Sequence, residues 1–161
     1  MRTWSPAIQP PTPSIRLMGN LLVLLQFGLL MLLAAAAGPS LTRGALPAPT
    51  WMLAGLSLAL AIWTLAHNRI GNFNIRPVPK RGGRLVTSGP YRWIRHPMYT
   101  SVLLGAAALA WAAPAWAWLG WFGLWLVLWA KATLEESQMM ELHPDYRAYR
   151  QRSRRFLPWL L

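Results

Sequence analysis

The chain alternates long uncharged stretches with short polar ones. Residues 17–37, 45–66 and 97–130 contain no Asp, Glu, Lys or Arg. A helix needs about 20 apolar residues to cross a bilayer core of about 30 Å. Residues 17–37 and 45–66 therefore each predict one transmembrane helix. The third stretch would form a helix of about 51 Å at about 1.5 Å per residue, which is too long for one upright span.

Pro114 divides the third stretch. A proline inside a helix lacks the amide donor, and its ring clashes with the preceding turn. We therefore predict a helical hairpin with spans at 97–113 and 115–133; the alternative is one kinked, tilted helix. The predicted fold class is all-α, a polytopic membrane helical bundle of about four transmembrane helices. We expect residues 1–161 to form a single integral-membrane domain.

Basic residues are concentrated on one side of these spans. The 161 residues carry a net charge of +12, with 16 Lys or Arg against 4 Asp or Glu. Seven basic residues separate the second and third spans, and six lie in the C-terminal part of the chain, from Lys131 near the end of the fourth span onward: Arg69, Arg76, Lys80, Arg81, Arg84, Arg92 and Arg95, then Lys131, Arg147, Arg150, Arg152, Arg154 and Arg155. Cytoplasmic segments carry the Lys/Arg excess, so we expect a multi-pass protein with both termini cytoplasmic. Orientation accounts for the charge, so the expected partners are membrane lipids and no nucleic acid.

Several chemistries do not fit the sequence. It has no cysteine, which excludes disulfides, cysteine zinc sites and thiol nucleophiles. It has no Gly-x-Gly-x-x-Gly or Walker-type phosphate loop. His67, His96 and His143 are far apart and lack metal-motif spacing, so no metal site is predicted.

Tryptophans mark one face of the fourth predicted span. Trp121, Trp125 and Trp129 recur every four residues and therefore share a helix face. Such a stripe can form the aromatic wall of a ligand pocket. Lipid contact or packing within the bundle is the alternative, and it is the commoner use of an apolar helix face.

One polar motif lies at the start of the third span. Pro97 suits the first turn of a helix, and it holds His96 extended at the helix entrance. Arg95 and His96 would then present donors to an anion at a helix N-terminus, with Tyr99 just inside. The alternative is a snorkelling Arg, an interfacial His and a Tyr of the aromatic belt.

The second polar motif, Glu135-Glu136, lies at the end of the fourth span, and Glu135 shares a helix face with Lys131. Carboxylates near a helix C-terminus face an unfavourable dipole, which suggests that they bind a cationic or hydroxyl-rich ligand. A solvated helix end with a weak surface ion pair is the alternative.

The order of these motifs is more specific than either motif alone. The run from Gly82 to Tyr99 (GGRLVTSGPYRWIRHPMY) precedes the hydrophobic hairpin, then Glu135-Glu136, then Tyr-Arg-Ala-Tyr at 146–149. Over about residues 67–158, this arrangement resembles the isoprenylcysteine carboxyl methyltransferase family, whose plan the phospholipid methyltransferases share. The resemblance implies a helical membrane enzyme that uses S-adenosylmethionine as its cofactor.

The resemblance also implies a cofactor site. Carried over by position, it comprises Gly83, Arg84, Leu85, Val86, Tyr91, His96, Pro97, Met98, Tyr99 and Glu135. Arg95 joins it because, like His96, it suits the cofactor's carboxylate. Glu135 would accept hydrogen bonds from the ribose or amino group, and the two tyrosines would form a slot for the adenine.

Three further residues are predicted to act in catalysis: Lys131, Glu136 and Arg152. The family's substrate-carboxylate arginine lies four residues before the first Glu, where this chain has Lys131, which keeps the charge without the planar fork. A carboxylate acceptor needs only positioning by such a cation, whereas an amine needs a proton acceptor such as Glu136. Residues 142–155 are expected to form an amphipathic interfacial helix that closes the pocket, with Arg152 in a second role there.

The resemblance thus implies methyl transfer to a lipophilic small-molecule or prenylated acceptor at the cytoplasmic membrane face. The preferred acceptor is a carboxylate of the isoprenylcysteine type. N-methylation of an amino-phospholipid headgroup is the alternative reaction. An alternative of another class is a non-catalytic membrane protein whose basic loop binds anionic lipid.

Overall fold

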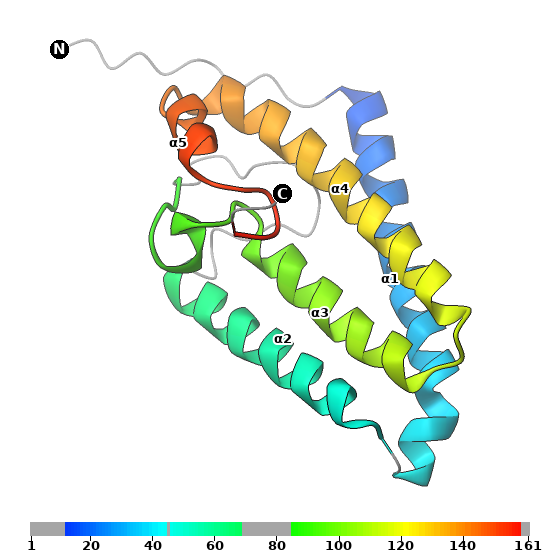
Figure 1. Ribbon diagram of the computed structural model, residues 1–161. Helices are drawn as coiled ribbons and strands as arrows, with labels where there is room; N and C mark the ends of the chain where they lie inside the picture. Colours follow the sequence, from blue (N-terminus) through cyan, green and yellow to red (C-terminus); the bar gives the residue numbers. More distant parts are fainter. Residues whose placement is uncertain (1–11, 45, 69–84, 159–161) are drawn as a thin grey trace, which may run out of the picture.

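The computed structural model describes residues 12–44, 46–68 and 85–158, and this part of the chain is helical and contains no strand (Figure 1). Its α-helices are α1 (Pro13–Arg43), α2 (Ala48–His67), α3 (Pro97–Ala112), α4 (Ala117–Leu142) and α5 (Tyr146–Arg152). A short 3-10 helix, η2 (Gly89–Arg92), precedes α3. The predicted all-α class is confirmed.

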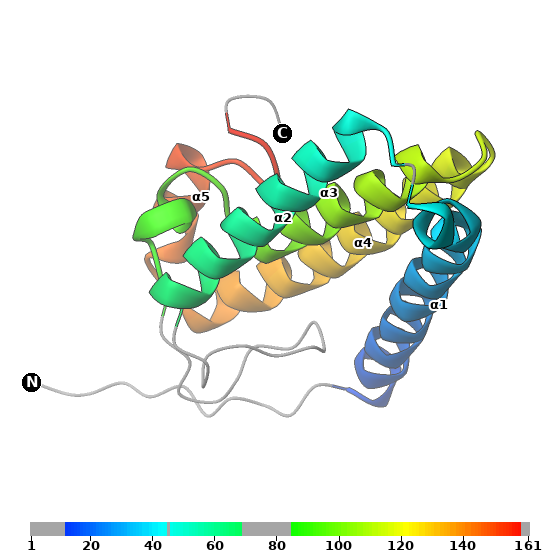
Figure 2. The same cartoon turned by 90° about the horizontal axis from the view of Figure 1, so that it is seen from below.

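Three of these helices, α1, α2 and α4, are long and apolar enough to cross a membrane, and α3 is a shorter apolar helix. The hairpin predicted at Pro114 is confirmed, because α3 ends at Ala112 and Ala113 is extended. Helix α4 then runs back beside α3 (Figures 1 and 2), and the Trp121 indole Nε1 donates a hydrogen bond to the carbonyl of Leu103, 2.9 Å away.

Two helices extend well beyond their predicted spans. Helix α1 begins at a proline in its first turn, is capped by Thr12 and ends at Gly44, whose φ of 69° is left-handed. Helix α4 continues nine residues beyond the predicted boundary at 133, to Leu142. Glu135 and Glu136 therefore lie within the helix and not at its last carbonyls.

The C-terminal helix is shorter than the predicted 142–155. Helix α4 ends at Leu142, and α5 covers only the seven residues Tyr146–Arg152. Beyond Ser153 the chain turns back and forms a single bridge with the segment before α3. The amide of Arg154 donates a hydrogen bond to the carbonyl of Trp93 at 2.8 Å. The amide of His96 donates one to the carbonyl of Arg155 at 3.1 Å. We call residues 153–158 the C-terminal tail.

The helices pack through small and aliphatic side chains. Helix α2 packs along α3, and α1 packs on α4 and α3. The buried core includes Leu33 from α1 together with Ala106, Leu124 and Leu128. Gly120 lets Leu33 approach α4 closely, since an added Cβ would lie 3.3 Å from the leucine side chain. Small residues at such contacts are typical of helices that pack within a membrane.

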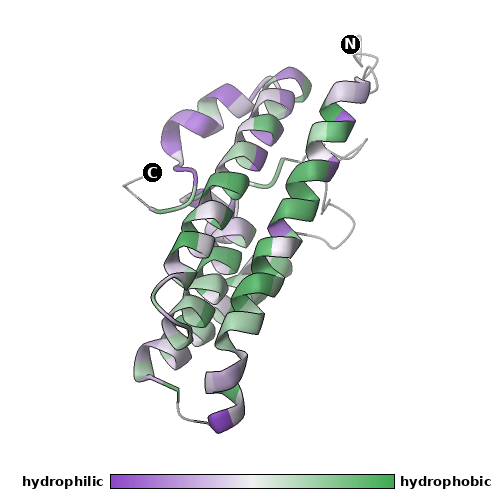
Figure 3. Cartoon of the chain, turned by 90° about the vertical axis from the view of Figure 1, so that its right-hand side faces the viewer, coloured by the Kyte–Doolittle hydropathy of each residue, from purple (hydrophilic) through white to green (hydrophobic). Residues whose placement is uncertain are grey.

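The outer faces of the bundle are apolar, as Figure 3 shows along the length of α1. Large hydrophobic side chains are among the most exposed: Met31 is 73% exposed and Leu119 76%. A water-facing surface rarely carries such extensive apolar patches, whereas lipid accommodates them. The hydrophilic residues gather at one end, around α5 and the end of α4 (Figure 3).

Gly89 fixes the turn that leads into α3. Its φ is +57°, and a Cβ at this position would overlap the imidazole of His67 at the end of α2. We expect Gly89→Ala to destabilise the protein by about 1–2 kcal/mol from the backbone alone, with the overlap adding to this. Gly28→Ala is the matched control, because nothing lies within 4 Å of that Cβ and alanine favours a helix. SDS unfolding of both variants measures the difference, and equal stabilities would contradict the assigned turn.

Candidate functional site

Glu136 is the centre of a buried cluster of cations. Its side chain is 2% exposed, and four cationic groups contact it from three parts of the chain. The Nε of Arg95 lies 2.9 Å from Oε1, and the Nη2 of Arg155 lies 3.1 Å from Oε2. The imidazole Nε2 of His96 is 3.1 Å from Oε1, and the Nε of Arg150 is 3.5 Å from Oε2. Glu136 thereby joins α4 to the segment before α3, to α5 and to the C-terminal tail.

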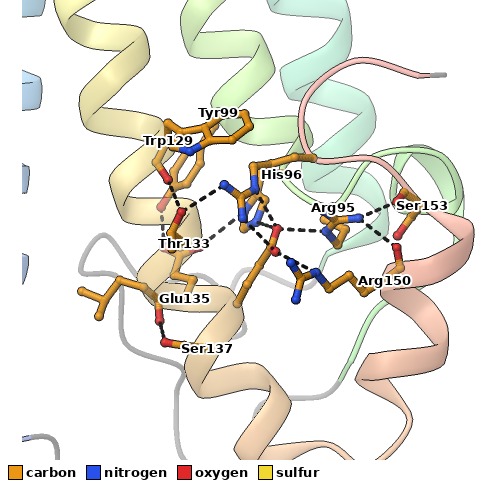
Figure 4. Close-up of polar contacts among 12 residues, drawn as sticks. Arg95, His96, Tyr99, Trp129, Thr133, Glu135, Ser137, Arg150 and Ser153 are labelled. Carbon is orange, nitrogen blue, oxygen red and sulfur yellow. Dashed lines mark hydrogen bonds and ion pairs between the residues drawn. The ribbon is translucent and has the colours of Figure 1, made fainter. Parts of the chain in front are cut away.

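Glu135 is the more accessible carboxylate, with its side chain 21% exposed. The hydroxyl of Tyr99 donates a hydrogen bond to it. The Nδ1 of His96 lies 3.4 Å from its other oxygen. The rings of His96 and Tyr99 are stacked, with their centres 5.4 Å apart (Figure 4). His96 is therefore held between two carboxylates and against a tyrosine.

The C-terminal tail completes the cluster. Arg155 donates through Nη1 to the hydroxyl of Thr133 at 3.0 Å, and its guanidinium lies 4.4 Å from the ring centre of Trp129. The carbonyl of Phe156 accepts a hydrogen bond from the Thr100 hydroxyl at 2.7 Å. Arg95 in turn donates to the carbonyl of Ser153 (Figure 4). These contacts join the tail to α3 and α4.

Lys131 lies one helical turn before Glu135 and is only 1% exposed. Its ammonium Nζ donates to the amide oxygen of Gln26 in α1, 2.6 Å away. It also lies 5.1 Å from the centre of the Tyr99 ring, within range of a cation–π interaction. Lys131 therefore borders the Tyr99 and Glu135 part of the cluster from deeper in the bundle.

Tyr91 holds the turn before α3 in place. Its hydroxyl accepts a hydrogen bond from the Asn68 amide at 3.0 Å, and its carbonyl accepts one from the Tyr149 hydroxyl at 2.7 Å. Burial raises the pKa of Tyr91 to about 12, an effect that the Asn68 hydrogen bond reduces and the charge of Glu135 increases. Tyr91 is therefore a neutral phenol throughout the physiological range.

The predicted residues other than Tyr91 divide into four groups. The structure brings together Arg95, His96, Tyr99, Lys131, Glu135 and Glu136. A second group lies close to the cluster in sequence, and within the described part of the chain it forms no hydrogen bond with the cluster's carboxylates. Pro97 is buried in the first turn of α3, and the carbonyl of Met98 accepts a hydrogen bond from the Ser101 hydroxyl. Leu85 and Val86 are half-buried just before η2. Gly83 and Arg84 lie outside the described residues. Arg152 lies apart, exposed, with its guanidinium 5.9 Å from the Tyr149 ring centre.

Sequence reasoning missed Arg155, Arg150 and Gln26 as members of this cluster. Arg150 lies in a basic C-terminal segment, which suggests contact with anionic lipid. The sequence of that segment does not distinguish Arg155 from its basic neighbours. Gln26 lies in a stretch that composition marks as apolar. The tryptophan stripe has two different environments. Trp129 lies beside Arg155, so the C-terminal end of the stripe borders the site. Trp121, at the other end, donates a hydrogen bond to a carbonyl of α3 and so packs within the bundle.

Protonation of His96 is expected to make stability depend on pH. Burial alone would lower the His96 pKa, but hydrogen bonds and charges from Glu135 and Glu136 outweigh it, so the pKa is raised. The stabilising contribution is fully present below the unfolded-state pKa of about 6.5 and is lost as pH rises through the folded-state pKa. The stability difference between wild type and His96→Gln, measured by SDS unfolding, should therefore be constant below about pH 6.5 and shrink as the pH rises above that value. A pH-independent difference would contradict a charged His96.

Comparison with protein families gives one match. The model of the phospholipid methyltransferase family matches residues 49–145. No curated protein and no solved structure matches the chain. The matched residues span α2, α3 and α4 and contain the six predicted residues that the cluster brings together. Helix α1 and the C-terminal tail lie outside the matched region. The match covers more than half of the chain and includes the clustered His96 and Glu135. The motifs noted in the sequence resemble the same group of integral-membrane methyltransferases. The chain therefore belongs to the phospholipid methyltransferase family, which is part of that group.

Proposed function

We propose that the protein transfers a methyl group from S-adenosylmethionine to a carboxylate on a lipophilic acceptor. The observation that supports this most directly is the cluster itself, where His96, Tyr99 and Glu135 meet beside the buried ammonium of Lys131. Family membership supports the methyltransferase class. The choice of a carboxylate acceptor is our inference from the charges of the site.

The donor set of the cluster fits S-adenosylmethionine. Among the described residues, Arg95, Arg150 and Arg155 all contact the carboxylate of Glu136, and Glu135 is the second carboxylate of the cluster. Three guanidinium charges therefore stand against two carboxylates even before His96 and Lys131 are counted. That excess suits the cofactor's carboxylate. Glu135 has room to accept from hydroxyl or amino groups because it is partly exposed.

Other predicted residues would contribute to the same cofactor site. Tyr91 and Tyr99 offer aromatic surface for the adenine. The backbone at Leu85, Val86, Pro97 and Met98 would form the remaining wall, whereas the predicted Gly83 and Arg84 lie outside the described residues. Arg152 lies apart from the cluster, with its guanidinium 5.9 Å from the Tyr149 ring centre, and its second role near the pocket stays a proposal.

S-adenosylmethionine supplies a methyl group that its sulfonium already activates. The chain's task is then to hold the acceptor in line, which is mainly a proximity effect. Lys131 would hold an acceptor carboxylate by charge, and such a nucleophile needs no proton acceptor. Glu136 is poorly placed to take a proton from an amine, because both of its oxygens already accept from cations. We therefore assign Glu136 to positioning Arg95, His96 and Arg155.

The second candidate reaction is N-methylation of an amino-phospholipid headgroup. The family's description favours it. Glu135 would then be the proton acceptor, because it is the more accessible carboxylate of the pair. For either acceptor we propose four spans with both termini cytoplasmic, a lipid-like substrate entering sideways between helices, and the cofactor arriving from the cytosol.

Calorimetry on detergent-purified protein tests the cofactor site. We expect S-adenosylhomocysteine, the demethylated product, to bind wild type, and Glu135→Ala to weaken binding roughly 10- to 100-fold, because hydrogen bonds to charged groups contribute about 1.5–3 kcal/mol. Glu141→Ala is the matched control, since Glu141 is exposed near the end of the same helix. Equal affinity in wild type and Glu135→Ala would remove the proposed site. A wild type that does not bind the nucleotide would favour the non-catalytic lipid-binding alternative.

A further inference from the structure

The C-terminal tail carries an aromatic side chain into the site. Phe156 is only 2% exposed, although it lies near the end of the described chain. Its ring centre lies 5.8 Å from that of Trp129, 6.0 Å from that of His96 and 6.5 Å from that of Tyr99. The ring therefore contacts both α3 and α4, beside the imidazole of His96.

Hydrogen bonds of the tail backbone fix where this ring lies. The carbonyl of Phe156 accepts a hydrogen bond from the Thr100 hydroxyl at 2.7 Å. The carbonyl of the preceding residue, Arg155, accepts one from the amide of His96 at 3.1 Å. Both bonds join the tail to the start of α3, so the Phe156 side chain leaves the backbone at a fixed place relative to His96.

The His96 imidazole needs such neighbours, because rotation of the ring about χ2 is only weakly restricted within the side chain itself. Its Nδ1 lies 3.4 Å from Glu135, and its Nε2 lies 3.1 Å from Glu136. The ring stacks on Tyr99, with the two planes 5° apart, and Phe156 meets it at 60°. The two aromatic rings thus restrain the imidazole in the orientation in which each nitrogen faces a carboxylate.

The charges around His96 come from every element that packs against it. The carboxylates are Glu135 and Glu136 of α4, which contact the imidazole directly. The cations that interact with these carboxylates are Arg95 before α3, Lys131 in α4, Arg150 in α5 and Arg155 in the tail. Phe156 carries no charge, so its replacement leaves all of these charges in place. A changed titration of His96 in a Phe156 variant would therefore report a changed position of the imidazole.

We propose that Phe156 is a positioning residue: its ring holds the His96 imidazole between the two carboxylates, and His96 in turn directs Glu135 toward the cofactor. The inference rests on the proposed function, since it takes Glu135 as the carboxylate that accepts from the ribose or amino group. It extends the site to the C-terminal tail, which lies outside the matched family region.

Histidine NMR tests the contact without any ligand. The chain has three histidines, so protein labelled in the imidazole carbons gives three signals, and His96→Gln identifies that of His96. In wild type, burial lowers the pKa of His96 but the two carboxylates outweigh it, so the pKa lies above its ordinary value of about 6.5. We expect a lower His96 pKa in Phe156→Leu, because the imidazole is no longer restrained beside the carboxylates that raise it.

Phe156→Tyr separates the ring contact from stability. It keeps the aromatic ring but buries a hydroxyl, which carries a cost in stability of its own. If Phe156 acts through its ring, Phe156→Tyr should retain the His96 pKa of wild type despite that cost. Leu157→Ala is the matched control in the tail, since Leu157 is 44% exposed, and it should also leave the His96 pKa unchanged.

Nucleotide affinity connects the contact to the cofactor site. Calorimetry with S-adenosylhomocysteine should show a loss of roughly three- to tenfold in Phe156→Leu, because hydrogen bonds to the Glu135 carboxylate are weakened but not removed. By the same argument, the loss in Phe156→Tyr and in Leu157→Ala should be less than about twofold.

The outcomes separate this inference from the proposed function. An unchanged His96 pKa in Phe156→Leu would overturn the inference, and so would an equal decrease in Phe156→Leu and Phe156→Tyr, which would make Phe156 a general structural residue. A lower His96 pKa in Phe156→Leu with unchanged nucleotide affinity would show that the contact does not serve the cofactor site. If wild type shows the expected titrations but binds no nucleotide, the proposed function is wrong while the contact between Phe156 and His96 stands.

Discussion

Glu136→Gln is expected to be the most destabilising single substitution in the site, lowering the free energy of unfolding by about 3–5 kcal/mol. Glu136 is almost completely buried and contacts Arg95, His96 and Arg155. Glutamine has nearly the same shape but cannot neutralise these cations, so buried positive charges would be left uncompensated. SDS unfolding followed by circular dichroism measures the loss, and nucleotide affinity should fall with it.

Glu141→Gln provides the comparison for this substitution, because it changes the same residue type on an exposed position of the same helix. Surface ion pairs contribute about 0–1 kcal/mol, so little change is expected there. A Glu136→Gln variant as stable as Glu141→Gln would show that the cluster of arginines does not depend on this carboxylate.

Lys131→Met should selectively impair use of the acceptor. Methionine is similar in length and unbranched, but it removes the ammonium that lies between Gln26 and Tyr99. We expect kcat/KM for a carboxylate acceptor to fall roughly 30-fold or more, because truncating one partner of a buried charge interaction costs about 2 kcal/mol or more. Calorimetric affinity for S-adenosylhomocysteine should be nearly unchanged, since the cofactor residues are retained.

Lys131→Arg tests whether charge alone is sufficient. It keeps the cation but changes its shape, so partial activity is expected. Equal activity of Lys131→Met and wild type toward the carboxylate would contradict the acceptor role of Lys131. Unimpaired methylation of phosphatidylethanolamine by Lys131→Met, with no carboxylate activity in wild type, would favour the amine reaction.

Much of the fold follows from local sequence. The bilayer sets how many apolar residues a span requires, so the stretches at 17–37 and 45–66 could be assigned from length and composition alone. Pro114 marks the hairpin because a proline lacks the helical amide donor and its ring clashes with the preceding turn. Pro39, which lies inside the last turns of α1, shows that a proline does not end every helix. The boundaries were less predictable: α4 continues as a polar helix to Leu142, and hydropathy carries no signal for where such a helix ends.

The site could be predicted only in part, because its contacts join distant segments. The motif containing His96 and the pair at Glu135 and Glu136 were recognisable, and they do meet. The choice of Arg155 over its neighbour Arg154 depends on how the C-terminal tail bridges the segment before α3. Similarly, Gln26 is one polar residue in an apolar stretch, and only the packing of α1 on α4 brings it to Lys131.

The most direct test of the central claim is transfer of labelled methyl from S-adenosylmethionine by purified wild type in nanodiscs. The nanodiscs contain both N-acetyl-S-farnesylcysteine and phosphatidylethanolamine, and the products are extracted and treated with base. We predict a lipid-soluble label that base releases as methanol, as expected of a methyl ester, and that is absent in Glu135→Ala. A base-stable label would contradict a carboxylate acceptor, and no label in any lipid, despite nucleotide binding, would contradict methyl transfer to these acceptors altogether.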